Sequence, residues 1–214
     1  MRNSQRRTSL ATGSLIIFVA LLSGLIPAGA KTATPDAITV TSTQGVTLCR
    51  PKGTRCFVPE VDDPIFIGDV ITTTSSGRLE FKVPGSDRSA ATHIFVLTRS
   101  KIRIDRDTEQ DFVKVEILSG TIGVEPSKGQ SFAVSFDSMV CIVGSGRVAI
   151  GYNMPKKRTG SASVSNVSAT CRCLSTPGGD YDIPVNTVVS FKSGRRINQG
   201  TVAEGFWSKL TQIK

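Results

Sequence analysis

The sequence contains five cysteines, and their spacing is typical of disulfides rather than of a metal site or a redox enzyme. Cys49 and Cys56 flank a segment centred on Lys52-Gly53, so a β-hairpin with that centre brings the two sulfurs opposite each other, at bridging distance. We therefore predict a Cys49–Cys56 disulfide, which for so small a loop stabilises the protein by about 2 to 3 kcal/mol.

The other three cysteines are Cys141 and the closely spaced Cys171 and Cys173. In Cys171-Arg-Cys173 the single intervening residue puts both sulfurs on one strand face, and it is shorter than the two-to-four-residue gap of a zinc site. Redox catalysis needs a C-x-x-C motif in a βαβ unit, which is missing. Cys141 can pair with either Cys171 or Cys173, and either pairing leaves one of the five cysteines free. We predict a Cys141–Cys171 disulfide.

The other residues that could perform chemistry do not form a recognisable site. The single histidine, His93, precedes an apolar strand with no acid or nucleophile nearby in the sequence, so we expect it to be structural or solvent-facing. The acid pairs Asp62-Asp63 and Asp105/Asp107 are expected in solvated loops, and a calcium loop needs a denser set of oxygen ligands. We therefore predict no enzyme activity, no cofactor and no metal.

The chain is basic, with a net charge of +9. Three of the cations, Lys156, Lys157 and Arg158, cluster in a predicted loop over residues 153–160 and form a candidate surface for an anionic partner. Nucleic-acid binding is not predicted, because aromatic residues make up only 6% of the chain and no basic run is interleaved with residues that could stack on bases.

Short alternating segments bounded by turn residues run through most of the chain and predict an all-β fold. The clearest is residues 65–81, in which two β-branched segments are expected to form a hairpin that turns at Ser75-Ser76-Gly77. Bends are expected at Gly45 and Gly120. Further strands are predicted at residues 37–46, 94–97, 101–105, 113–124, 132–136, 140–143, 148–150 and 161–170.

Only the C-terminus departs from this two-residue period. Thr201 and Glu204 fit a capping box, in which each side chain satisfies a free backbone N–H of the other's residue. Phe206 and Leu210 then fall on one face of a short helix. We predict that this helix covers one end of the β-core, with an exposed docking patch at Phe206 and Trp207 as the alternative.

The N-terminus predicts export. Basic residues precede an uncharged run of twelve residues, 15–26, which is followed by the small-x-small sequence Ala28-Gly29-Ala30. We predict Sec export, cleavage between Ala30 and Lys31, and a periplasmic or secreted protein. The alternative is an uncleaved anchor, although the run is shorter than the roughly 20 residues of a spanning helix. No stable membrane span is expected after cleavage.

Four motifs occur in order: GDVITT at 68–73, GRLEF at 77–81, LTRSKIRI at 97–104 and LSGTIGV at 118–124. Together they resemble the FecR domain, whose order is a G-D-x-I-x-T turn, an alternating strand, an S-x-I-x-I strand and an L-x-G-x-V-x-V strand. The resemblance implies a compact all-β domain of stacked short strands, β-solenoid-like or sandwich-like, that normally lies in the periplasm or outside the cell.

The predicted organisation has four parts: a signal peptide (1–30), an N-terminal strand with the cysteine hairpin (31–64), a FecR-like β domain (65–195) and a C-terminal helical segment (196–214). FecR-type transmembrane regulators place a cytoplasmic helical module before their membrane segment, whereas here 14 residues precede the apolar run. The resemblance therefore implies a free-standing exported FecR domain.

We accordingly expect a non-catalytic binding or scaffold module that interacts with an envelope or secreted protein or polymer of unknown identity. One alternative is a membrane-tethered periplasmic sensor in FecR-type signal transduction. The other is a carbohydrate-active enzyme on a β-solenoid, for which the sequence offers no recognisable carboxylate pair.

Overall fold

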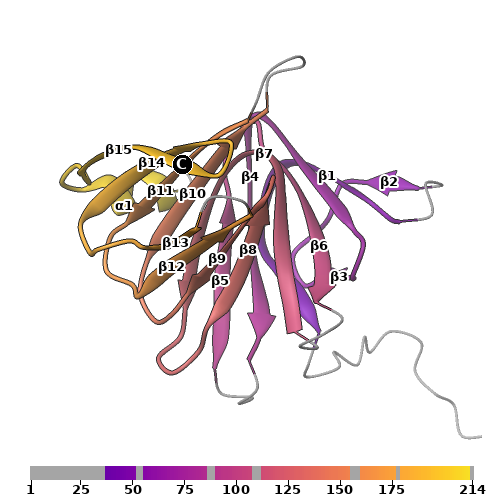
Figure 1. Ribbon diagram of the computed structural model, residues 1–214. Coiled ribbons are helices and arrows are strands. Elements are labelled where there is room, and N and C mark those ends of the chain that lie inside the picture. Colours follow the sequence, from indigo (N-terminus) through magenta and orange to yellow (C-terminus); the bar gives the residue numbers. More distant parts are fainter. Residues whose placement is uncertain are drawn as a thin grey trace, which may run out of the picture. The chain divides into compact units, whose positions relative to one another are not determined.

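The computed structural model describes residues 37–51, 55–85, 90–107, 112–154, 160–176 and 179–212. All of them belong to one compact unit, Ala33–Lys214. This unit is all-β, as predicted, and its described residues form fifteen strands and one short helix near the C-terminus (Figure 1). The strands are β1 (Ile38–Cys49), β2 (Cys56–Phe57), β3 (Pro64–Ile65), β4 (Val70–Pro84), β5 (Ala91–Val96), β6 (Lys101–Asp107), β7 (Phe112–Pro126), β8 (Phe132–Phe136), β9 (Met139–Val143), β10 (Val148–Asn153), β11 (Ser161–Asn166), β12 (Cys171–Ser175), β13 (Gly179–Asp182), β14 (Thr187–Lys192) and β15 (Arg195–Thr201), and the helix is α1 (Phe206–Thr211).

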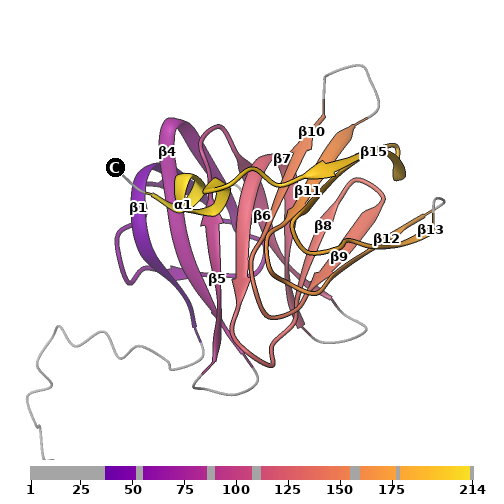
Figure 2. The same ribbon diagram turned by 90° about the vertical axis from the view of Figure 1, so that its left-hand side faces the viewer.

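The strands form one sheet that folds over on itself, because β1, β4 and β7 are long and each takes part in both halves (Figure 2). What we call the β10 half contains the first part of β1, the second parts of β4 and β7, and β5, β10, β11, β14 and β15. The β8 half contains the remaining parts of these three long strands with β2, β6, β8, β9, β12 and β13.

Glycines allow the long strands to bend from one half into the other. Gly45 of β1 has φ +55°, and the register of β1 against β4 shifts between Gln44 and Val46, which confirms the bend predicted there. A Cβ atom at Gly77 of β4 would lie only 2.1 Å from the carbonyl oxygen of Gly45. Two glycine backbones therefore meet where β1 and β4 bend together, and no larger residue fits at Gly77 without a shift of the backbone.

The hairpin predicted for residues 65–81 is wrong. Residues Val70–Pro84 form the single strand β4, and both its ends pair with β1, from Cys49 opposite Val70 to Thr39 opposite Lys82. Ser75-Ser76-Gly77, expected to be the turn, lies inside β4 next to the bend at Gly45. Polar residues with a glycine suit a bulge as well as they suit a turn. The strand reverses its direction only after Pro84.

The inner faces of the two halves enclose one hydrophobic core. Aromatic rings meet across it: the ring centroids of Phe136 and Tyr152 are 5.9 Å apart, and those of Tyr181 and Phe191 are 5.3 Å apart. Of the two predicted arrangements, this is the sandwich-like one. In a parallel β-solenoid successive strands are parallel, whereas among the described strands only β7 and β8 pair in parallel.

The predicted disulfide between Cys49 and Cys56 is present, and it closes the hairpin of β1 and β2. The two residues are directly opposite each other in the antiparallel register, with their Cα atoms 4.1 Å apart. The bond joins the short strand β2 to the end of β1.

The predicted Cys141–Cys171 disulfide is wrong, because the structure pairs Cys141 with Cys173. The reason is register: β9 and β12 are antiparallel, and Cys173 lies directly opposite Cys141, whereas Cys171 lies opposite Val143. Cys171 is a free, buried thiol on the same strand face. Burial raises the pKa of this thiol to about 12, so at neutral pH it stays protonated and unreactive.

The capping box predicted at Thr201 and Glu204 is not formed. Thr201 remains in the ladder of β15, opposite Thr187 of β14, and α1 begins only at Phe206. Its N-cap is Gly205, with φ 66° and no side-chain hydrogen bond to the helix. The ladder between β14 and β15 therefore overrides the local capping pattern, and residues 196–201 are strand rather than helix.

Helix α1 covers part of the outer face of the β10 half rather than an end of the core. Trp207 and Leu210 are buried against Ala149 of β10, and a Cβ at Gly123 of β7 would lie 2.9 Å from a methyl of Leu210 and 3.1 Å from the Trp207 ring. Phe95 meets the Trp207 ring edge to face at 5.8 Å. The alternative of an exposed Trp207 docking patch is therefore wrong.

Candidate functional site

Two groups of predicted site residues cannot be placed. The basic loop residues Lys156, Lys157 and Arg158 and the predicted cleavage site at Ala30 and Lys31 lie outside the described residues.

The other predicted candidates make ordinary surface contacts. His93 lies on the outer face of β5 with Nδ1 3.3 Å from Glu80 Oε1. Asp105 and Asp107 are in β6 rather than in a loop, and each has a carboxylate oxygen 3.8 Å from Lys114 Nζ. Within the described ranges, no three His, Cys, Asp or Glu residues come together as they would to hold a metal ion.

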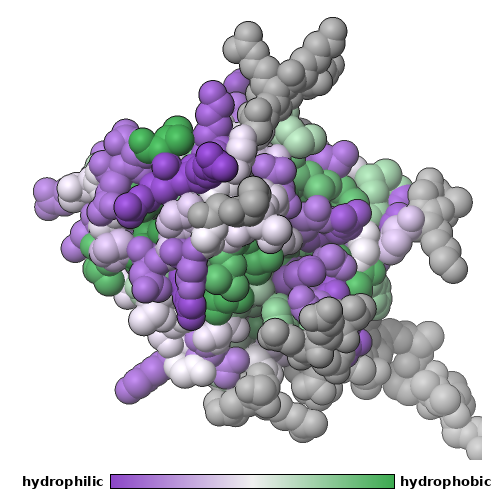
Figure 3. All heavy atoms as spheres, viewed as in Figure 1, coloured by the Kyte–Doolittle hydropathy of each residue, from purple (hydrophilic) through white to green (hydrophobic). Residues whose placement is uncertain are grey.

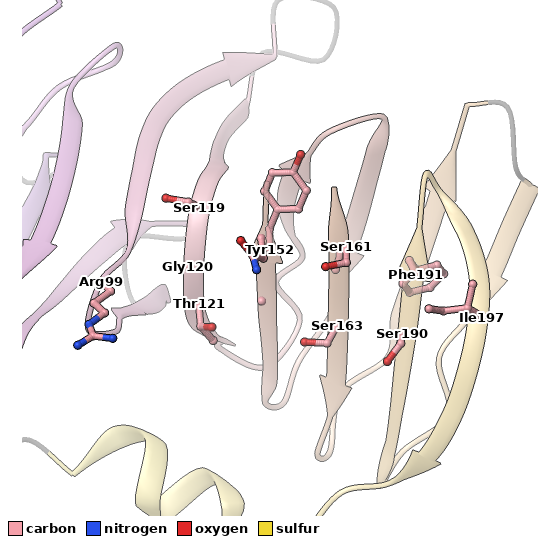
Figure 4. Close-up of a pocket in the computed structure, with 13 residues that line it drawn as sticks. Arg99, Ser119, Gly120, Thr121, Tyr152, Ser161, Ser163, Ser190, Phe191 and Ile197 are labelled. Atoms are coloured by element: carbon pink, nitrogen blue, oxygen red, sulfur yellow. The ribbon is translucent and has the colours of Figure 1, made fainter. Parts of the chain in front are cut away.

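An open groove of about 550 Å³ crosses the outer face of the β10 half. We call it the hydroxyl groove, because five of its lining residues carry hydroxyl groups on outward-facing side chains. These are Ser119, Thr121, Ser161, Ser163 and Ser190. Figure 4 shows them between Arg99 at one end of the groove and Ile197 at the other.

The floor of the groove is a row of residues that the strand register aligns across the sheet. Thr121 of β7, Gly151 of β10, Ser163 of β11 and Ser190 of β14 are successive direct partners and form one row across four strands. Neighbouring strands are about 4.8 Å apart, so the row is roughly 14 Å long. The residues that alternate with this row, such as Ile122 and Ile150, point into the core.

Gly151 leaves the middle of the row open. A Cβ atom at this position would lie 3.0 Å from Ser163 Oγ and 3.2 Å from Thr121 Oγ1. The two hydroxyl groups therefore flank a gap that exists because residue 151 has no side chain. The backbone at Gly151 is ordinary strand, so conformational freedom is not the reason that glycine fits here.

The Arg99 end of the groove is fixed by Ser100, which is buried immediately before β6. Ser100 Oγ donates a hydrogen bond to the Thr121 carbonyl oxygen (3.0 Å), which also accepts one from the Leu97 N–H (3.0 Å), and it accepts a hydrogen bond from the Thr121 N–H (2.9 Å). Gly120, with φ +93°, permits the close approach, since a Cβ there would lie 2.4 Å from Ser100 Cα. The predicted bend at Gly120 is thereby confirmed.

Thr73 of β4 also holds the turn that contains Arg99, through hydrogen bonds of its hydroxyl to Leu97 and Ser100. Its Oγ1 accepts a hydrogen bond from the Ser100 N–H (2.8 Å) and donates one to the Leu97 carbonyl oxygen (2.5 Å). Thr73, Ser100 and Gly120 come from three of the four sequence motifs, and they meet in one buried network. This network holds the turn that carries Arg99 against β7.

Arg99 is held in an unusual conformation with a free side chain. Its φ is 54°, in the left-handed region that non-glycine residues rarely adopt, and its N–H donates to the Thr74 carbonyl oxygen at 2.9 Å. Its guanidinium has no hydrogen-bond or ion-pair partner among the residues that the structure describes, and neither have the five hydroxyl groups. The polar groups that face the groove are thus free to bind a ligand.

The described lining of the groove contains one charged side chain, that of Arg99. The other titratable lining residue, Tyr152, is neutral, because burial and the nearby Asp137 raise the pKa of its hydroxyl. The rings of Tyr152 and Phe191 are 5% and 1% exposed, so they offer almost no aromatic surface. Ile197 of β15, 61% exposed, is the main apolar contact that the groove can make.

A partly buried ion pair that the sequence analysis missed stabilises the connection before β4. Arg50 Nη1 lies 2.6 Å from Asp69 Oδ2, and the guanidinium lies over the rings of Phe66 (4.3 Å) and Phe57 (5.2 Å). Burial raises the pKa of the Asp69 carboxyl, against the opposing effects of its hydrogen bond from the Phe66 N–H and of Arg50. A single carboxylate paired with an arginine that also bonds the Pro64 carbonyl oxygen fits a structural role.

Apolar side chains are also exposed in the connection from β2 to β4: Val58, Val61, Phe66 and Ile67 are each at least 40% exposed. On the face drawn in Figure 3, hydrophobic residues are interspersed with hydrophilic ones. These side chains offer no hydrogen-bonding pattern that would define a ligand. The hydroxyl groove, with its free polar groups, is therefore the better candidate.

No protein-family model matches the chain, and no curated protein matches it either. In the part of the chain that the structure describes, no helix has the length and apolar character needed to cross a bilayer. The two disulfides are typical of an oxidising, extracytoplasmic compartment.

Proposed function

We propose that this chain is an exported, FecR-like binding module without catalytic activity, which holds an extended stretch of an envelope or secreted polymer or protein in the hydroxyl groove. The observation that carries the proposal is the row of free hydrogen-bonding groups across four strands, with the free guanidinium of Arg99 at one end.

Surface hydroxyls on a sheet commonly face water. The groove adds two features: the gap over Gly151 and the Arg99 turn. Arg99 is kept in a strained conformation by the buried hydroxyls of Thr73 and Ser100. Strain of this kind is retained where the surrounding structure fixes it, and it is concentrated at binding and catalytic sites.

Export is supported by the N-terminal sequence and by the two disulfides, which point to a periplasmic or secreted location. The FecR-like assignment is supported by the joining of three motif residues, Thr73, Ser100 and Gly120, in one network. A binding role is favoured over glycoside hydrolysis, because that reaction needs a pair of carboxylates and the described lining residues include none.

The test fills the gap in the groove. Gly151→Val adds a β-branched side chain that suits a strand but occupies the space between Thr121 and Ser163. Gly200→Val of β15 is the matched control, because a Cβ there makes only an ordinary 3.5 Å contact with Val188 outside the groove. Purified wild type and both variants are immobilised, and binding of separated polymer and protein fractions of the envelope and medium is measured by biolayer interferometry.

We expect wild type and Gly200→Val to bind one of these fractions with the same affinity and Gly151→Val to bind it at least about tenfold more weakly, with unchanged thermal unfolding. Equal binding by all three proteins would contradict the proposal that the groove is the binding site.

A further inference from the structure

We infer that the ligand of the hydroxyl groove is an acidic glycan, lying across β7, β10, β11 and β14 with an acid group at Arg99. This inference rests on the proposed function and adds the chemical class of the ligand. It follows from the kinds of groups in the groove, their order and what the groove lacks.

The hydrogen-bonding groups match a polyol. Each Ser and Thr hydroxyl can both donate and accept, as sugar hydroxyls do. The row offers this dual capacity at Thr121 and Ser163, which lie on either side of Gly151, and again at Ser190, one strand spacing of about 4.8 Å beyond Ser163. A short run of sugar units can therefore bind along the row without a fixed pattern of donors and acceptors.

The position of the groove disfavours an extended peptide. Peptides that bind sheets usually add a strand at an edge, where unpaired backbone N–H and C=O groups are available. The groove lies on a sheet face, and the backbone groups of its floor at Gly151 and Ser163 are within the paired ladders of β7, β10, β11 and β14. The ligand must therefore bind to side chains, which here are mostly hydroxyls.

The charge of the groove selects an acid. Arg99 is the one charged side chain of the described lining, and no Asp or Glu of that lining opposes it. A guanidinium presents its N–H donors in a planar fork that matches a carboxylate or a sulfate. A single cation with no exposed stacking ring does not suit nucleic acid, which is bound through many phosphate contacts or through base stacking.

The apolar surface of the groove is small. Because the rings of Tyr152 and Phe191 are turned away from solvent, Ile197 is the main apolar group, and it lies at the end opposite Arg99 (Figure 4). Lipids and other mainly apolar ligands require a pocket lined by hydrophobic side chains. One isoleucine is enough to contact the C–H face of a sugar ring.

The experiment uses matched glycans. Oligosaccharides of galacturonate, alginate and hyaluronan are each prepared in the acidic form and in a carboxyl-reduced form that keeps the linkage and replaces the acid by an alcohol. Their affinities for the mature protein and its variants are measured by isothermal titration calorimetry at low and moderate salt.

We expect at least one acidic form to bind and its carboxyl-reduced form to bind more weakly. Arg99→Gln should reduce affinity for the acidic form roughly tenfold to a hundredfold, which is the range for a lost charge-assisted hydrogen bond, and leave affinity for the reduced form unchanged. Lys82→Gln, which removes an exposed positive charge of β4 away from the groove, is the control for general electrostatics.

The outcomes separate this inference from the proposed function. Equal binding of acidic and reduced forms, with no effect of Arg99→Gln, would overturn the preference for an acid. If none of the glycans binds while exported material still binds wild type and not Gly151→Val, the glycan class is wrong and the groove remains the site. If Gly151→Val binds every ligand as wild type does, the proposed function itself fails.

Discussion

Gly123 and Gly151 lie on the same outer face of the β10 half, in adjacent strands and adjacent rows, but only one of them is covered. Over Gly123 the side chains of Trp207 and Leu210 approach so closely that a Cβ would collide with them. Over Gly151, which is half-buried, a Cβ would lie about as close to Thr121 Oγ1 and Ser163 Oγ, but these hydroxyls can rotate away and no helix covers them. A missing side chain on a sheet face thus admits the chain's own helix in one row, and in the next it leaves a gap in which we propose that a ligand binds.

The surroundings of the two glycines agree with this difference. Around Gly123 the outward neighbours are apolar, namely Phe95 and Ala149, which pack with α1 in a small hydrophobic cluster. Around Gly151 they are Thr121 and Ser163, whose hydroxyls have no partner in the described part of the chain. Apolar surface is stabilised by burial within the protein, whereas free hydroxyls are satisfied by water or by a polar ligand.

The largest effect is expected from putting valine at Gly123. The new side chain would displace α1 and expose Trp207 and Leu210, so we expect the free energy of unfolding to fall by about 3 kcal/mol. Trp207 fluorescence should shift to the red. The same change at Gly151 should alter the free energy of unfolding by less than about 0.5 kcal/mol. Urea denaturation of the two variants compares them directly, and equal losses would refute the distinction between the two rows.

The next effect concerns the turn that carries Arg99. Ser100→Ala removes the hydroxyl that bonds both the N–H and the C=O of Thr121. The C=O keeps its hydrogen bond from the Leu97 N–H, so the expected loss of about 2 kcal/mol comes mainly from the N–H. Ligand affinity should fall as well, because the Arg99 turn loosens. Ser165→Ala, on the outer face of β11 away from the groove, is the control and should leave both unfolding and binding unchanged.

Arg99→Gly should separate stability from binding. Glycine adopts the left-handed conformation without strain, so we expect the variant to be as stable as wild type or more stable by up to about 1 kcal/mol. Affinity for the ligand should fall, because the free guanidinium is lost. Thermal unfolding and binding are measured on the same preparation; a destabilised variant would show that Arg99 has a structural role instead.

The smallest effect is expected at Cys171. With its pKa raised to about 12 by burial, the thiol should not react with iodoacetamide in the native protein at pH 8 and should react once the protein is unfolded without reductant. Peptide mapping should place the label on Cys171. Label on Cys173 would contradict the Cys141–Cys173 disulfide.

Alternation along the chain was sufficient to predict most strands. In β6, for example, Ile102 and Ile104 are buried and Arg103 is exposed, as the two-residue period predicts. The wrong predictions concern residues whose structure is decided by pairing with strands that are distant in the sequence. Ser75-Ser76-Gly77 became a bulge because β1 pairs with both ends of β4, and Thr201 stayed in a ladder although its local sequence fits a helix cap.

The site was harder to predict than the strands. The alternation of Ser161, Ser163 and Ser165 with Ala162 and Val164 did contain a signal, since it places serines on one face of β11. What the sequence could not supply was that β11 lies beside β10 and β14, which aligns these serines with Gly151 and Ser190. The disulfide partner of Cys141 was predicted wrongly for the same reason. Cys171 and Cys173 share a strand face, and only the register of β12 against β9 determines which of them lies opposite Cys141.

The most direct test of the groove is to map contacts on the labelled protein during ligand binding. Amide shifts are recorded in ¹⁵N–¹H spectra of the protein as soluble fragments of the bound polymer or protein fraction are added. The account predicts that the largest changes fall on Thr121, Gly151, Ser163 and Ser190 and at the Arg99 turn, and that Gly151→Val abolishes them. Changes concentrated instead on β15 alone or on the exposed apolar residues Phe66 and Ile67 would contradict it.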